Sequence, residues 1–129
     1  MILAIDPGRE KCGLAVLEEN RRPVLLAIVP RHALLEKIAS LITKHKIDVI
    51  VIGESADGKL VEKEMIKAGI TIGLVFIAEN NSTRQARERY WQENPPAGLW
   101  RFFPVSLRTP PRPVDDIAAL ILGERYLSR

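Results

Sequence analysis

The sequence has few of the features that mark secreted or membrane proteins. Cysteine occurs once, at Cys12, so no disulfide can form within the chain and the fold does not depend on an oxidising compartment. No apolar run approaches the ~20 residues that a membrane-spanning helix needs. The first predicted strand begins at residue 2, which leaves no room for a cleavable signal. We therefore expect a cytoplasmic protein without a membrane partner.

The excess of positive charge is small. The 129 residues include 19 Lys and Arg against 16 Asp and Glu, which gives a net charge of +3 and a pI near 9.2. This balance is compatible with a nucleic-acid partner but is not specific for one. Hydrophobic residues make up 47% of the chain, enough for a buried core, and the length is that of one ordinary domain. Because repeats and low-complexity segments are also lacking, the sequence predicts a single domain over residues 1–129.

The hydrophobic pattern predicts an α/β protein. Three apolar runs joined by short polar links indicate an antiparallel meander, and strands and helices then alternate along the chain. The fourth strand is a continuous apolar run and is expected to lie parallel to the first. Strands are predicted at 2–5, 13–17, 24–29, 47–52 and 70–78, and helices at 34–46, 58–68, 82–91 and 115–127. The prediction is a mixed five-stranded sheet flanked by helices.

Acidic residues follow three of these strands and open the last helix. Asp6, Glu54 and Glu79 stand at strand ends, and Asp115 and Asp116 begin the final helix. In open α/β sheets, functional groups gather outside the carboxyl ends of the strands. Carboxylate oxygens suit Mg²⁺ and Mn²⁺, and two such ions ~3.5–4 Å apart can cleave a phosphodiester. The joint pattern therefore predicts a two-metal site with Mg²⁺ or Mn²⁺ as the cofactor.

Each acid also has a plainer explanation when it is taken alone. Asp6 precedes a Pro-Gly pair and could form an Asx turn, and Asp57-Gly58 is most simply a turn. Glu54 and Glu79 could be solvated loop acids. Asp115 and Asp116 suit the positive end of a helix. Only the combination of these acids favours catalysis.

Several segments resemble the motifs of RNase H-like nucleases. Residues 2–8, followed by 13–16, resemble the first-strand motif of the RuvC-type Holliday junction resolvases and the related YqgF/RuvX family. Residues 47–53 resemble the fourth strand of both groups. Residues 79–83 resemble the YqgF motif in which an acid precedes a threonine-capped helix, and residues 114–127 are similar to that family's last helix. The resemblance covers nearly the whole chain and implies an RNase H-like fold.

The resemblance also implies roles for the acids. Asp6 would be the first metal ligand, and Asp115 or Asp116 the last. The middle ligand has two candidates: resolvases have a glutamate where Glu54 stands, whereas the YqgF pattern uses the position of Glu79. This sequence has both, so the choice stays open.

The implied activity is metal-dependent endonucleolytic cleavage of structured DNA or RNA, with junction DNA or precursor ribosomal RNA as substrate. The alternative is a nucleic-acid-binding module that has kept the fold and lost cleavage. Asn80-Asn81 replace an arginine-containing step of the YqgF pattern, which leaves the substrate open. Junction resolvases act as dimers, so the resemblance adds a homodimer to the expected assemblies.

Basic residues near the acids are predicted to bind nucleic-acid phosphates, which supply most of the affinity of such proteins. They are Arg84, Arg87, Arg101, Arg108 and Arg112. Trp100 and Phe102 could stack on unpaired bases, or could instead anchor their proline-rich segment to the core. The arginines after Glu79 could equally form a solvated helix face paired with Glu88 and Glu93.

Overall fold

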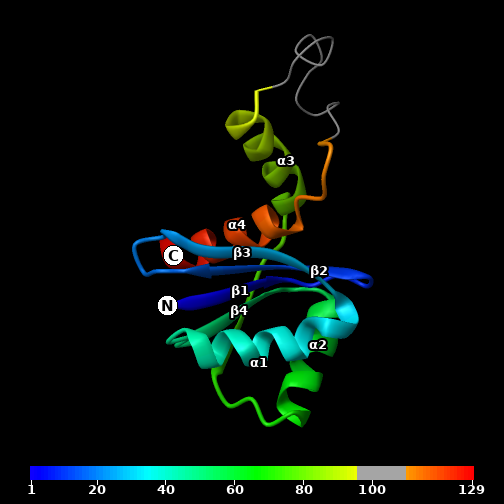
Figure 1. The fold of residues 1–129 in the computed structure, drawn as a ribbon, viewed down its shortest axis with the longest axis vertical. Coiled ribbons are helices and arrows are strands. Elements are labelled where there is room, and N and C mark those ends of the chain that lie inside the picture. Colours follow the sequence, from blue (N-terminus) through cyan, green and yellow to red (C-terminus); the bar gives the residue numbers. More distant parts are fainter. Residues whose placement is uncertain (96–109) are drawn as a thin grey trace.

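A five-stranded mixed sheet forms the centre of the protein. The computed structural model describes residues 1–95 and 110–129. The strands are β1 (Ile2–Asp6), β2 (Lys11–Leu17), β3 (Pro23–Pro30), β4 (Val49–Gly53) and β5 (Gly73–Ile77). Their spatial order is β3-β2-β1-β4-β5 (Figure 1). The first three strands form an antiparallel meander, and β4 and β5 run parallel to β1. The predicted α/β class and the mixed sheet are confirmed.

Helices cover both faces of this sheet. They are a short 3-10 turn η1 (Arg31–Ala33), α1 (Leu34–Lys44), α2 (Ala56–Lys67), α3 (Ser82–Glu93) and α4 (Asp115–Ser128). The helices α1 and α2 lie on one face, α4 lies on the other, and α3 extends from α4 away from the sheet (Figure 1). None of the helices in the described ranges is long and apolar enough to cross a membrane.

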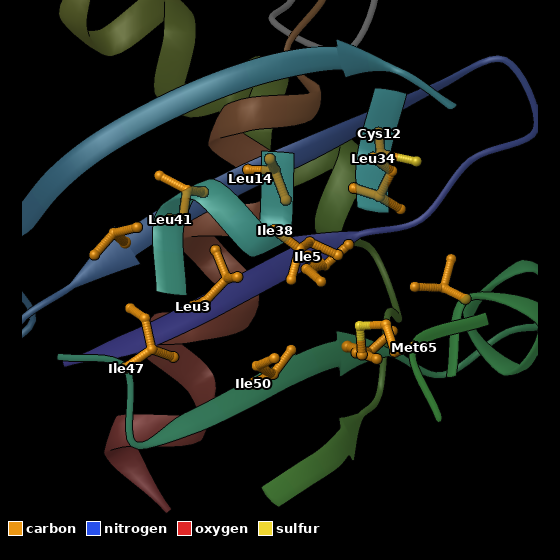
Figure 2. Close-up of a cluster of buried hydrophobic side chains, with 13 residues drawn as sticks. Leu3, Ile5, Cys12, Leu14, Leu34, Ile38, Leu41, Ile47, Ile50 and Met65 are labelled. Atoms are coloured by element: carbon orange, nitrogen blue, oxygen red, sulfur yellow. The ribbon is translucent and has the colours of Figure 1, made fainter. Parts of the chain in front are cut away.

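The alternation of side chains along the strands assigns each residue to one face. Figure 2 shows Leu3 and Ile5 of β1 on the α1/α2 side, where they meet Ile38 of α1. Each fully buried side chain of this kind contributes about 1.5–3 kcal/mol. The alternate residues Ile2 and Ala4 pack in the cluster that includes α4. Because side chains alternate along a strand, Asp6 belongs to the α4 face.

Two predicted boundaries differ from the structure near α2. Asp57 and Gly58, predicted as a turn, lie in the first helical turn, where the Ser55 hydroxyl accepts a hydrogen bond from the Gly58 N–H at 3.0 Å. Ile70, predicted to begin a strand, belongs to the end of this helix. Its N–H donates to Met65 O at 3.0 Å, while Gly69 adopts φ +82°. This is a glycine-dependent helix end, in which the hydrophobic residue after the glycine packs back on the core.

Candidate active site

Asp6 lies at the carboxyl edge of the sheet between two glycines. It pairs with Gly13 of β2 in the antiparallel register. On its other side, Ile5 pairs with Ile52 of β4, so Gly53 continues β4 beside Asp6. Neither neighbour has a side chain. The α4 face of the sheet is therefore bare on both sides of this carboxylate, and other groups can approach it closely.

The space above Gly13 is filled by the start of α4. A Cβ atom on Gly13 would lie 2.9 Å from Asp116 N and closer still to Asp115 O. Backbone of α4 thus rests directly on β2, next to the residue that pairs with Asp6. This contact brings Asp115, the first residue of α4, into the neighbourhood of Asp6.

The space above Gly53 is filled by the side chain of Glu79. A Cβ atom on Gly53 would lie 2.6 Å from the carboxyl carbon Cδ of Glu79 and closer still to Oε1. Glu79 comes two residues after the end of β5. Ile77, the last residue of β5, packs in the α4-side cluster, and strand alternation gives Glu79 the same side as Ile77. Three carboxyl groups, from Asp6, Glu79 and Asp115, therefore gather above this edge.

Burial and neighbouring negative charges raise the pKa values of Asp6 and Glu79. The pKa of Asp6 is raised from 3.8 to about 7, first by burial and then by the charges of Glu79 and Asp115. The pKa of Glu79 is also raised, by burial and by the charge of Asp57. Moreover, Glu79 Oε1 is buried and has no hydrogen-bond partner among the described residues. A buried carboxylate oxygen without a partner is costly, and a bound cation would remove that cost.

The carboxylate oxygens are suitable donors for a divalent cation, although they are not arranged around a common metal position. Among residues 1–95 and 110–129, no group of three His, Cys, Asp or Glu side chains is arranged to hold a metal ion. Asp115 Oδ2 lies 3.6 Å from Lys11 Nζ, so this carboxylate has a cationic partner. Hard carboxylate oxygens, one of them unpartnered, are nevertheless the donors that Mg²⁺ and Mn²⁺ prefer.

The other two predicted acids are not brought into this cluster. Glu54 is exposed, and its N–H extends the β4–β5 ladder by donating to Ile77 O at 2.8 Å. Side chains alternate along the strand, so Glu54 lies on the same face as Ile50 and Ile52, the face covered by α1 and α2. Asp116 is buried, and its Oδ1 accepts from Ile117 N at 2.9 Å and from Arg112 Nη1 at 3.1 Å. These bonds give Asp116 a structural role at the start of α4.

Comparison with known proteins gives a distant nuclease relative. No protein-family model matches the chain. The chain is 26% identical over 138 residues to a curated protein of Porphyromonas gingivalis (strain ATCC BAA-308 / W83) named "Putative pre-16S rRNA nuclease". The matched region covers 98% of this chain and 94% of that protein. The similarity is thus low in identity but extends over almost the full length of both proteins.

Two residues near the acids did not stand out in the sequence. Asp57, in the first turn of α2, is close enough for its charge to raise the pKa of Glu79. Lys11 begins β2 and pairs with Asp115. The sequence does contain a signal for Lys11. It lies two residues before Gly13 in the same strand, so its side chain is on the same face of the sheet as Asp6, which pairs with Gly13. Asp57 has no comparable signal, since its helix was predicted to begin later.

A cavity of about 400 Å³ adjoins the cluster at Asp115. Among the described residues, its cationic lining residues are Lys11, Arg87 and Arg112, and three prolines from residues 110–113 form an apolar wall. Arg84 does not line it, but pairs with Glu88 at 3.9 Å on the exposed face of α3. Arg89 likewise pairs with Glu93 at 3.6 Å, as the alternative interpretation of this helix expected. The predicted Arg101, Arg108, Trp100 and Phe102 lie outside the described residues.

Proposed function

We propose that the protein is a metal-dependent nuclease that cleaves phosphodiester bonds in structured nucleic acid, with precursor ribosomal RNA as the first candidate substrate. The observation that carries the proposal is the convergence of Asp6, Glu79 and Asp115 above two glycines, with Glu79 Oε1 buried and unpartnered among the described residues. The sequence resemblance to the YqgF/RuvX nucleases supports it. So does the similarity to the Porphyromonas gingivalis protein, whose name refers to pre-16S rRNA.

In this proposal, Asp6, Glu79 and Asp115 would hold Mg²⁺ or Mn²⁺. Such ions, when bound, activate a water molecule and stabilise the leaving oxygen. Asp6 is central, because its position between Gly13 and Gly53 lets the other two acids reach it from opposite sides. The charges of Glu79 and Asp115 repel that of Asp6, and a bound cation would relieve this repulsion.

The cavity beside Asp115 would hold the substrate backbone. Lys11, Arg87 and Arg112 line it and provide the positive charge that phosphates require. Arg87 is exposed, which leaves its guanidinium accessible from solvent. The proline wall offers apolar surface to a sugar or base. Phosphates bound here would position the chain next to the acids, and binding of this kind carries no base sequence information.

Glu79→Gln is expected to lower the cleavage rate by about a thousandfold, which corresponds to ~4 kcal/mol in the barrier. The substitution keeps the shape of the side chain but removes the charge that would bind the cation. The matched control is Glu54→Gln, which removes the same charge from the exposed position across the sheet and should leave the rate near that of the wild type. The measurement is the initial rate of cleavage of structured RNA and of junction DNA with Mn²⁺.

Two results would contradict the proposal in different ways. A large loss in Glu54→Gln with full activity in Glu79→Gln would make Glu54 the middle ligand. Binding of both substrates without any cleavage, in either metal, would favour the alternative of a nucleic-acid-binding module. A preference for RNA over junction DNA at equal salt would in turn support the precursor ribosomal RNA as substrate.

Arg87→Gln is expected to weaken nucleic-acid binding and to reduce its salt dependence. If Arg87 contacts one phosphate, the slope of log K against log salt should fall by about 0.7–0.9. Lys67→Gln is the control, because Lys67 is exposed at the end of α2, outside the cavity, and its loss changes the net charge equally. The measurement is a salt titration of fluorescence anisotropy with labelled RNA. Equal slopes for both variants would show that Arg87 acts only through net charge.

A further inference from the structure

The segment that presents Glu79 lies beyond the sheet. β5 is an edge strand, and its last paired residue is Ile77. Glu79 follows in a short connection to α3, in which Asn81 adopts the left-handed conformation with φ 61°. Strand pairing therefore does not fix the position of Glu79, and some other contact must hold this connection in place.

Arg125 of α4 makes that contact. Its Nη1 donates to Ala78 O at 2.9 Å and its Nη2 to Asn80 O at 2.7 Å, the carbonyls on either side of Glu79. Nη2 also donates to Gln85 Oε1 of α3 at 2.9 Å. The carbonyl of Glu79 itself accepts from Ser82 N at 2.9 Å. Three consecutive carbonyls are thus satisfied, and Arg125 supplies two of the bonds.

We propose that Arg125 is the positioning residue for Glu79 and that it sets the metal affinity of the site without touching the metal. The proposal rests on the proposed function, because it takes Glu79 as a ligand. Gly53 gives the Glu79 side chain its place above β4, and Arg125 fixes the backbone from which that side chain starts. The two contacts act on the same residue from opposite ends.

The guanidinium group suits this task better than another cation would. It is planar and presents several N–H donors in a fixed fork, so one side chain can hold two carbonyls and a side-chain amide at once. Arg125 also lies on the helix that begins with Asp115. A single rigid element therefore supplies one acid of the cluster and positions another, which ties the distance between Asp115 and Glu79 to the packing of α4 on the sheet.

The test measures binding of Mn²⁺ alone to the full chain, by calorimetry and by electron paramagnetic resonance. Arg125→Gln is expected to weaken Mn²⁺ binding about tenfold, the lower end of what loss of a supporting residue costs a metal site. The matched control is Arg89→Gln, which breaks another link between α3 and α4, the hydrogen bond from Arg89 to Glu124. Arg89 makes none of the hydrogen bonds that hold the carbonyls of Ala78 and Asn80 on either side of Glu79. Arg89→Gln should bind Mn²⁺ like the wild type. Thermal unfolding of both variants accounts for any shared loss of stability.

Arg125→Lys and Glu79→Gln complete the experiment. If Arg125 acted only through its charge, lysine would restore the affinity; the positioning role predicts that it does not, because an ammonium group lacks the fork. Wild-type affinity in Arg125→Gln, together with a loss in Glu79→Gln, would overturn the positioning role alone. Wild-type affinity in Glu79→Gln would remove Glu79 from the metal site, and both proposals about it would then be wrong.

Hydrogen exchange provides a second readout that needs no metal. The Ser82 amide donates to Glu79 O inside the connection that Arg125 holds. Its exchange should become faster in Arg125→Gln and stay unchanged in Arg89→Gln. Unchanged exchange at Ser82 in both variants would show that the connection keeps its structure without Arg125, which would contradict the proposal.

Discussion

Asp6→Asn is expected to make the metal-free protein more stable at neutral pH. The folded state raises the pKa of Asp6 from 3.8 to about 7. Between these values the folded protein keeps a proton that the unfolded chain has already lost, so stability falls as the pH rises. Each pKa unit corresponds to about 1.36 kcal/mol, which gives a loss on the order of 4 kcal/mol once Asp6 is ionised. Asparagine never ionises and escapes this loss.

The measurement is urea unfolding of both proteins in the presence of a chelator, from about pH 4 to about pH 8. At the acid end, asparagine resembles the protonated carboxyl group, and the two stabilities should agree. They should separate as the pH rises through the raised pKa, with the variant more stable. Adding Mn²⁺ near pH 8 should then stabilise the wild type and leave the variant unchanged. Parallel pH profiles would contradict the raised pKa of Asp6, which burial and then the charges of Glu79 and Asp115 produce.

The same substitution should abolish cleavage. Asp6 lies between Gly13 and Gly53, over which Asp115 and Glu79 approach. A cation shared by the three acids would therefore lie next to the Asp6 carboxylate. A loss of at least about a thousandfold is expected, or ~4 kcal/mol in the barrier. Greater stability with lost activity is the combination expected of a functional group held in an unfavourable environment, whereas removing a carboxylate that takes part in a structural network lowers stability. Persistent activity in the more stable variant would exclude Asp6 from the mechanism.

Much of the fold was predictable because its strands are strongly apolar and the apolar residues of α1 recur at clear helical spacing. The order of elements, the mixed sheet and the place of Asp6 at the end of the first strand followed from the pattern alone, and the resemblance implied the role of Asp6 as a metal ligand. Strand alternation places Glu54 and Glu79 on opposite faces of the sheet. Glu54 shares the α1/α2 face with Ile50 and Ile52, whereas Glu79 shares the α4 face with Ile77. That argument needs the register of β5 against β4, in which Ile77 pairs with Gly53, and the sequence alone does not give this register.

Other features of the site depend on contacts between residues far apart in the chain. The contact of Arg125 with the carbonyls of Ala78 and Asn80 spans more than forty residues, and an arginine in a helix has no local pattern that indicates it. The charge of Asp57 reaches Glu79 because the fold brings the first turn of α2 near the segment that follows β5. Such features arise from packing, which a single sequence without its structure does not display.

Gly13→Ala is expected to have the largest effect on stability of any single methyl group added to the described residues of the site. The new Cβ atom would meet backbone on α4, at Asp115 O and Asp116 N, and backbone cannot rotate away as a side chain can. Relief requires α4 to move off the sheet, where Ala119 and Leu120 pack against β1 and β2. Overpacking of this kind costs about 3 kcal/mol or more. Urea unfolding measures the loss.

Gly53→Ala and Gly73→Ala are the matched comparisons, because each adds the same methyl group to another strand. At Gly73 no atom of residues 1–95 or 110–129 lies within 4 Å of the new atom, so stability should change by less than about 0.5 kcal/mol. At Gly53 the atom meets the end of the Glu79 side chain, which can rotate away. The stability cost should therefore be small, while the displaced carboxylate should weaken Mn²⁺ binding. Equal stability losses at Gly13 and Gly53 would show that Glu79 is held as rigidly as the backbone of α4, and the clash with Glu79 would then have to be relieved by the sheet itself.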